Sequence, residues 1–314
     1  MPGARVLVTG ASSGIGAAVS TLLSLRGYRV VGSGRRAEGL ALAPDGPLEA
    51  AVLADLTEPG APALVVGKAV AALGGLDVVV SCAGAGWQGP FWSMSADEID
   101  DLLDINLRAP LHLAHAAAPH LLASGGQLVL VGSIAGLVGV PEEVAYGTAK
   151  AGLRGLADGL RLEWSRNWGD VHSGGLGETT QAPPGTSAAL ASGALASSGR
   201  ASSGLARTGG PAGRSRGTIG AVRTCRHATV TLVSPGVVAT PFFSRRNTPY
   251  THSWPHPMPV TKVSRRIVRA IEQRQEDVVV PAWLGLAARL NGGLPRLYRV
   301  LANFPWRVQH LPSG

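Results

Sequence analysis

The sequence predicts an α/β fold, a doubly wound parallel sheet in a single domain, on two observations. Short Val-rich runs that are apolar throughout recur along the chain, as expected of strands that a parallel sheet buries on both faces. Segments with helical spacing lie between them, and this alternation is typical of a sheet with helices on both faces. Ligands of such sheets bind beyond the carboxyl ends of the strands, so the residues after each run are candidates for a site.

The glycine-rich turn Gly10–Gly16 lies between an expected first strand, Ala4–Thr9, and an expected apolar helix over about 17–26. Glycines let the backbone turn tightly and approach a pyrophosphate, and the helix N-terminus offers it free N–H groups. A generic tight turn would show the same glycines, but strand, turn and helix in this order are the context that dinucleotide binding requires.

The second expected strand, Tyr28–Ser33, is followed by Gly34, Arg35 and Arg36. An acidic residue normally stands here and holds the ribose 2′-hydroxyl of the adenosine. Guanidinium groups suit a 2′-phosphate instead, so the sequence favours NADP(H) over NAD(H). The alternative is that both arginines are solvated loop residues.

The other strands are expected at Ala51–Leu56, Asp77–Ser81, Gln127–Ser133 and Ala228–Val233, with a final edge strand at Asp277–Pro281. Asp55 is placed to accept a hydrogen bond from the adenine amino group, or equally to act as a helix N-cap. Gly10, Arg35, Gly84 and Ser133 follow strand ends and are expected together on one rim of the sheet.

Tyr146 and Lys150 lie four residues apart in a helical segment, so they share one helix face. A phenol with a pKa near ~10 is a poor acid–base catalyst at neutral pH, and a nearby ammonium favours the phenolate. Such a pair occurs by chance on many helices, so it indicates a catalytic pair only when the surrounding elements also fit. An amphipathic helix over 97–107, which carries Asn106 and continues past Pro110, belongs to that context.

Together these residues resemble the short-chain dehydrogenase/reductase family, whose fold is the Rossmann fold. The matching features are Thr9-Gly-x-x-x-Gly14-x-Gly16, Ala83-Gly84, Asn106, Ser133, Tyr146-x-x-x-Lys150 and Ser234-Pro-Gly236 with Thr240. The resemblance covers the chain except 173–227 and roughly the last fifty residues. It implies an oxidoreductase that transfers a hydride between NAD(P) and a carbonyl or secondary alcohol, such as a ketoreductase.

The resemblance implies a role for each catalytic residue. Tyr146 would be the general acid in reduction and the base in the reverse direction, and Ser133 would hydrogen-bond the same substrate oxygen. Lys150 would bind the nicotinamide ribose and lower the pKa of Tyr146, and Asn106 would hold a water that links Lys150 to solvent. With the residues argued above, the predicted cofactor contacts are Gly10, Ser12, Ser13, Gly14, Ile15, Gly16, Arg35, Arg36, Asp55, Leu56, Ala83, Gly84, Asn106, Tyr146, Lys150, Pro235, Gly236, Val237 and Thr240.

One position departs from the family pattern. Ser81-Cys82 stands before Ala-Gly where the family usually has Asn, a chiefly structural residue. Cys82 is expected to be a buried small residue and not a reactive thiol.

The domain prediction is one catalytic domain over 1–172 and 228–281. The run 173–227 is Gly-, Ser-, Ala- and Thr-rich and is expected to be a disordered insertion, far from the site at the opposite rim. Residues 282–314 are expected to form a basic, amphipathic helical extension. It is either an ordinary helix that caps the fold or an interfacial helix at a membrane surface.

The net charge of +8 is uneven along the chain. Residues 1–172 have 11 basic and 16 acidic side chains, whereas 241–314 have 11 basic and 3 acidic ones. No nucleic-acid recognition motif accompanies the basic part, which fits a membrane surface or an acidic partner better. Two cysteines, Cys82 and Cys225, make no disulfide framework, and no metal-ligand spacing is present. No room for a signal peptide precedes the first strand and no apolar run spans a bilayer, so a cytoplasmic location is expected.

The predicted function is therefore NADP(H)-favouring oxidoreduction, and the alternative is a non-catalytic dinucleotide-sensing or scaffold protein. The segment 241–262 resembles a lid and carries Phe242, Phe243, Trp254 and Met258, which hints at a hydrophobic substrate. The family resemblance implies a homodimer or homotetramer.

Overall fold

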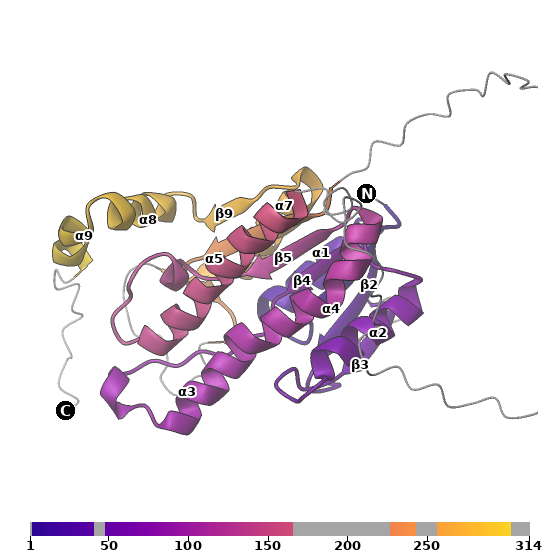
Figure 1. The fold of residues 1–314 in the computed structure, drawn as a ribbon, viewed down its shortest axis with the longest axis horizontal. Helices are drawn as coiled ribbons and strands as arrows, with labels where there is room; N and C mark the ends of the chain where they lie inside the picture. The colour runs from indigo at the N-terminus through magenta and orange to yellow at the C-terminus, as the bar shows by residue number, and fades with distance from the viewer. Residues whose placement is uncertain (1, 41–47, 166–226, 243–255, 303–314) are drawn as a thin grey trace, which may run out of the picture. The chain divides into compact units, whose positions relative to one another are not determined.

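The computed structural model describes residues 2–40, 48–165, 227–242 and 256–302, which form a seven-stranded parallel sheet with helices on both faces (Figure 1). The predicted fold class is confirmed. All the described elements belong to one of the two units of the chain, Met1–Trp168 with Cys225–Gly314. Residues 166–226 lie outside the described part, and the predictions on the insertion and on Cys225 fall there.

The strand order is β3-β2-β1-β4-β5-β6-β9, and every neighbouring pair is parallel. The strands are β1 Arg5–Thr9, β2 Arg29–Gly34, β3 Ala50–Leu53, β4 Val78–Ser81, β5 Gln127–Val131, β6 Thr229–Pro235 and β9 Asp277–Val280. The predicted edge strand is confirmed, since β9 pairs only with β6 among the described strands. A separate two-stranded ribbon joins β7 Val238–Ala239 to β8 Met258–Pro259.

Alternate residues of the central strands face two different cores, because strand side chains have a period of two. Leu128 and Leu130 of β5 pack with α2, α4 and α5, which lie over one face of the sheet (Figure 1). Val129 and Val131 pack with α1 and α7 on the other face. The main helices are α1 Gly14–Leu25, α2 Ala61–Leu73, α3 Ala96–Leu103, α4 Ala109–Ser124, α5 Val144–Ser165 and α7 Val260–Gln273.

Shorter elements connect these helices and extend them. They are the 3₁₀ turns η1 Phe91–Ser93 and η3 Ile134–Gly136, the π-helix η2 Asp104–Arg108, and the helices α8 Leu284–Gly293 and α9 Pro295–Ala302. The helix predicted over 97–107 runs on through η2 into α4, as expected, but with a π-helical segment that the spacing did not reveal. Among the described residues, no helix is both apolar enough and long enough to cross a bilayer.

Several boundaries differ from prediction. The strand predicted over Gln127–Ser133 ends at Val131, and the one predicted over Ala228–Val233 runs from Thr229 to Pro235. Two further differences have local reasons. The first helix begins at Gly14 and not near residue 17, because Ser13 is its N-cap and the glycine turn already contains its first turn. The third strand ends at Leu53, because the Asp55 carboxylate accepts hydrogen bonds from the backbone N and Oγ1 of Thr57 and forms a turn there.

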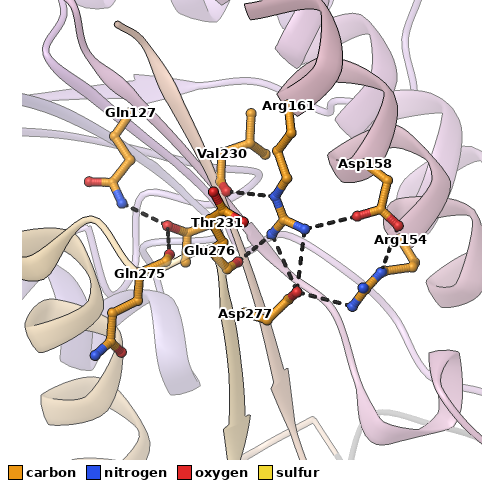
Figure 2. Close-up of polar contacts among 9 residues, drawn as sticks. All are labelled: Gln127, Arg154, Asp158, Arg161, Val230, Thr231, Gln275, Glu276 and Asp277. Carbon is orange, nitrogen blue, oxygen red and sulfur yellow. Dashed lines mark hydrogen bonds and ion pairs between the residues drawn. The ribbon is translucent and has the colours of Figure 1, made fainter. Parts of the chain in front are cut away.

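Arg161 joins the C-terminal part of α5 to the amino edge of the sheet, where the strands begin (Figure 2). Its guanidinium donates to the carbonyl oxygens of Val230 and Glu276 and to the carboxylates of Asp158 and Asp277. This helix end and the start of β6, which flank residues 166–226, therefore meet at the edge opposite to the strand ends that the sequence selected.

Candidate active site

Three loops meet at the carboxyl edge of the sheet, where the strands end. Gly10 has a left-handed φ of +67°, and a Cβ on it would lie 2.9 Å from the backbone N and Cα of Ala83. A Cβ on Gly16 would overlap the carbonyl oxygen of Gly10, and one on Gly14 would lie 3.3 Å from the Cβ of Thr240. The loops after β1, β4 and β6 thus approach one another only because these positions are glycines.

Thr9 holds the loop after β4 against the end of β1. Its buried Oγ1 accepts hydrogen bonds from the backbone N of Cys82 at 3.1 Å and of Ala83 at 3.3 Å. Cys82 is partly exposed, but desolvation of its thiol raises the pKa of that group to about 12. The thiol is protonated at neutral pH, as expected of an unreactive cysteine, but the residue is half-buried and not buried as predicted.

Asn106 lies in the π-helix η2 and is fully buried. Its Nδ2 donates to the carbonyl oxygens of Ala85 at 2.8 Å and Leu102 at 3.0 Å, while its buried Oδ1 has no hydrogen-bond partner among the described residues. A Cβ on Gly84 would lie 2.7 Å from this Oδ1 and 3.5 Å from Nζ of Lys150, so both groups border the same glycine. A buried acceptor without a partner is a binding position for a water or a ligand.

Lys150 is 6% exposed and donates to one carbonyl oxygen, that of Val131, at 3.3 Å. No carboxylate of the described residues pairs with it, and burial lowers the pKa of the ammonium from 10.5 to about 8, with a small opposing effect of Cys82. Its Nζ lies 5.7 Å from the ring centroid of Tyr146. The expected Tyr–Lys pair on one helix face is present in α5.

Ser133 caps the 3₁₀ turn η3, and its Oγ accepts from the backbone N of Ala135 at 3.2 Å. A Cβ on Gly136, at the end of this turn, would lie 2.6 Å from the backbone carbonyl of Lys150. The turn therefore packs directly on α5, which sets Ser133 relative to Lys150. The hydroxyl hydrogen of Ser133 is left to donate to a ligand.

Arg35 and Asp55 meet beside the glycine turn. The guanidinium of Arg35 is 67% exposed and lies 3.6 Å from the Asp55 carboxylate. Burial acts to raise the pKa of Asp55, but the hydrogen bonds from Thr57 and the charge of Arg35 outweigh it and hold that pKa below its usual range. The N-cap of α2 is Gly60, so Asp55 caps a turn and not a helix. Arg36 is exposed.

The segment after β6 forms the remaining wall. The backbone N of Gly236 donates to the carbonyl of Val280 at 2.7 Å, while Thr240 lies against Gly14. The Phe242 ring lies 5.9 Å from that of Tyr146, centroid to centroid. A hollow of about 290 Å³ adjoins this segment and is lined by Val237, His256, Met258, Lys262, Pro281, Trp283 and Leu284. Residues 243–255, with Phe243 and Trp254 of the predicted lid, lie outside the described part.

The structure brings most of the predicted site residues to this edge. Gly10, Gly14, Gly16, Ala83, Gly84, Asn106, Ser133, Tyr146, Lys150 and Thr240 are linked by the contacts above, and Ser12 adjoins Gly34 before Arg35. Sequence reasoning missed Gly136 and the carbonyl of Val131, because a close approach and a backbone acceptor leave no side-chain pattern. In the described ranges no group of His, Cys, Asp and Glu is arranged to hold a metal ion.

Comparison with known proteins identifies the family. Residues 4–174 match the family model described as short chain dehydrogenase. The chain belongs to this family. The chain is 38% identical over 168 residues to the 1-deoxy-11-beta-hydroxypentalenate dehydrogenase of Streptomyces avermitilis, covering 50% of this chain and 62% of that one. It is 34% identical over 167 residues to a hydroxysteroid 11-beta-dehydrogenase 1-like protein of Xenopus tropicalis, covering 51% and 58%.

Solved structures show that the short-chain dehydrogenase fold extends beyond the matched region. A short-chain dehydrogenase/reductase of Burkholderia phymatum in complex with NAD is 18% identical, with a TM-score of 0.68 over 94% of this chain and 95% of that one. A short-chain dehydrogenase of Burkholderia cenocepacia in complex with NADP is also 18% identical, with a TM-score of 0.67 over 97% and 99%. The predicted family and its NAD(P)-binding Rossmann fold are thus confirmed, while the chain spans about three fifths of the two named relatives.

Proposed function

We propose that this short-chain dehydrogenase is an NADP(H)-dependent oxidoreductase that interconverts a carbonyl and a secondary alcohol, with Tyr146 as general acid–base. The observation that carries the proposal is the pairing of a half-buried phenol with a buried ammonium that no carboxylate of the described ranges neutralises. An unneutralised cation in a protein interior costs stability, and such costs are concentrated at functional sites.

The residues at the carboxyl edge fit a nicotinamide dinucleotide. Gly10, Gly14 and Gly16 leave the backbone bare at the N-terminus of α1, where free N–H groups and the helix dipole favour a pyrophosphate. The group, when bound, supplies or accepts the hydride. Lys150 would hold the nicotinamide ribose, and Val237 with Thr240 would contact the carboxamide end.

The chain's own residues would manage the proton. Tyr146 donates its phenolic proton to the substrate oxygen during reduction, while Ser133 donates a hydrogen bond to the same oxygen. The Lys150 ammonium stabilises the phenolate that remains. The unpaired Oδ1 of Asn106 would hold a water beside Lys150, through which the proton is replaced from solvent.

The preference for NADP(H) rests on Arg35 and Arg36. Arg35 is two-thirds exposed and is oriented at the end of β2 by its 3.6 Å contact with Asp55, so it can turn to a 2′-phosphate without leaving a buried gap. Solved relatives hold NAD in one case and NADP in another, so the choice depends on each chain's own residues.

The substrate proposed is a hydrophobic ketone or alcohol. The ring of Tyr146 lies next to that of Phe242, and Tyr146 also packs against the small apolar cluster of Met94, Leu102 and Ala145. The names of the Streptomyces and Xenopus relatives refer to a hydroxypentalenate and a hydroxysteroid, which are hydroxylated apolar ring systems. A homodimer or homotetramer and a cytoplasmic location, with peripheral membrane contact, remain parts of the proposal.

The test is the Tyr146→Phe variant, assayed by NADPH consumption with a panel of apolar ketones. We expect turnover to fall by about 10²–10⁴-fold, the usual contribution of general acid catalysis, while the Kd for NADPH stays unchanged. Unchanged turnover in this variant would show that Tyr146 is not the general acid–base. A wild-type protein that binds NADPH but turns over no ketone, and oxidises no alcohol with NADP, would favour the non-catalytic alternative.

A further inference from the structure

The helices α8 and α9 expose apolar side chains that the rest of the described chain does not cover. The exposed fractions are 71% for Leu286, 57% for Leu294, 46% for Leu297 and 66% for Val300. Burying such side chains is worth about 1.5–3 kcal/mol each, so leaving several exposed on adjacent turns is costly unless a partner covers them.

Helical spacing places two of these side chains on one face of α9, where they form an apolar stripe. Leu297 and Val300 are three residues apart and lie above one another on the helix, and Leu294, which caps α8 and directly precedes α9, continues the same spacing in the sequence. Arg296 and Arg299 have the same spacing and form a second stripe beside the first. We call Leu286, Arg289, Leu294, Arg296, Leu297, Arg299 and Val300 the α8–α9 surface.

The charge of this surface has a single sign. Residues 284–314 include four arginines and no aspartate or glutamate. Within the described part of the chain, Arg289, Arg296 and Arg299 form no ion pair. Three unneutralised guanidinium groups beside an apolar stripe complement a partner that is both anionic and apolar.

The surface is attached firmly to the catalytic domain by its opposite side. Tyr298 donates from its hydroxyl to the carbonyl of Gly139 at 2.9 Å, and Asn291 donates to the carbonyl of Leu137 at 3.3 Å. At the start of α8, Leu284 is buried against Gly236. A partner on the α8–α9 surface would therefore lie next to the loop that follows Ser133.

We propose that the α8–α9 surface docks on the surface of a phospholipid bilayer that contains anionic lipids. Arginine stems can cover apolar acyl surface while the guanidinium groups contact lipid phosphates. A helix of eight residues cannot span a bilayer, which takes about 20, so the helix would lie in the interface. A second copy of the chain fits less well, because two surfaces with arginines and no acid would repel each other.

The experiment is co-sedimentation of the full chain with vesicles of phosphatidylcholine alone or mixed with phosphatidylglycerol. We expect binding to the mixed vesicles that weakens with added salt, and little binding to phosphatidylcholine. R296Q/R299Q should weaken binding to the mixed vesicles by roughly 30-fold, because each arginine near an anionic surface strengthens binding by about fivefold. L294N/L297N should weaken it by at least about tenfold.

Matched controls keep the proposal falsifiable. L25N removes a leucine that is 80% exposed on α1, and R265Q/R269Q removes two exposed arginines from α7. Both should bind vesicles like the wild type.

Three outcomes would overturn the proposal: the same loss of vesicle binding in these controls, equal binding to both kinds of vesicle, or no binding to either. A change of oligomeric state in L294N/L297N without vesicle binding would assign the surface to a second copy. A titration of the same variants with NADPH tests the proposed function separately from vesicle binding.

Discussion

The two edges of the sheet differ in how completely their polar and charged side chains are hydrogen-bonded. At the amino edge, Arg161 is 14% exposed as a side chain and donates to two carbonyls and two carboxylates (Figure 2). At the carboxyl edge, Lys150 is buried but has one carbonyl partner within the described part of the chain, where the nearby Asn106 also keeps an oxygen without a hydrogen-bond partner. Full pairing stabilises a fold, whereas incomplete pairing keeps groups available for a ligand at a cost in stability.

The largest expected change in stability comes from Arg161→Met. The carbonyl oxygens of Val230 and Glu276 would lose a donor, and of the cationic partners that the structure describes for Asp277 only Arg154 would remain. We expect the free energy of unfolding in urea to fall by about 2–4 kcal/mol with kcat/KM unchanged for the folded enzyme. The control is Arg154→Met, whose ion pairs are more exposed and whose cost should stay below about 1 kcal/mol. Equal losses of unfolding free energy in the two variants would contradict the conclusion that the contacts of Arg161 stabilise the fold more than those of Arg154.

At the carboxyl edge, replacement of a cation by methionine should raise the free energy of unfolding and not lower it. Lys150→Met replaces a buried cation with an apolar side chain of similar length, so unfolding free energy at pH 7 should rise by about 1–3 kcal/mol. Turnover should be lost, because the phenolate of Tyr146 would have no cation beside it. Urea unfolding of the cofactor-free protein measures the first effect, and a loss of stability would contradict it.

The pH dependence of stability should follow from the pKa of Lys150. Burial lowers this pKa from 10.5 to about 8, so between these pH values the unfolded state holds more protons than the folded state. Stability of the cofactor-free wild type should then rise with pH over that window, and the advantage of Lys150→Met should shrink. Unfolding at about pH 7.5 and about pH 9.5 tests this; a constant difference would mean that Lys150 is not desolvated as described.

The smallest expected effect is that of Tyr298→Phe, which removes the hydrogen bond to Gly139 and keeps the ring. The loop after Ser133 would be held less firmly, so KM for a ketone should rise by about 2–5-fold. The kcat value and the Kd for NADPH should not change. Steady-state kinetics gives these values separately, and a weakened affinity for NADPH in place of a raised KM would argue against this role.

The parts of the site that sequence reasoning found are local patterns. Gly10, Gly14 and Gly16 stand between a strand and a helix, and Tyr146 with Lys150 shows helical spacing, so each could be predicted from neighbouring residues. Buried strands can likewise be recognised as apolar runs: two of the seven strands of the sheet start at the expected residue, Gln127 and Asp277, and the other five start one residue away from it.

Contacts between distant segments could not be predicted in this way. Arg161 and Glu276 are 115 residues apart and Tyr298 and Gly139 are 159 apart, and in each pair the acceptor is a backbone carbonyl that any residue carries. The π-helical turn around Asn106 has the same limitation, since the residue spacing of 97–107 does not distinguish it from an α-helix and its contact with Gly84 joins segments 22 residues apart.

The most direct measurement is a titration with NADPH and with NADH, followed by intrinsic tryptophan fluorescence, on the wild type and on Arg35→Ala. A cofactor site at the carboxyl edge, with Arg35 at the 2′-phosphate, predicts saturable binding of both cofactors to the wild type and tighter binding of NADPH. In Arg35→Ala the affinity for NADPH should fall by roughly tenfold or more, to that of NADH, which should not change. A folded wild type that binds neither cofactor would contradict the assignment of the carboxyl edge as the cofactor site.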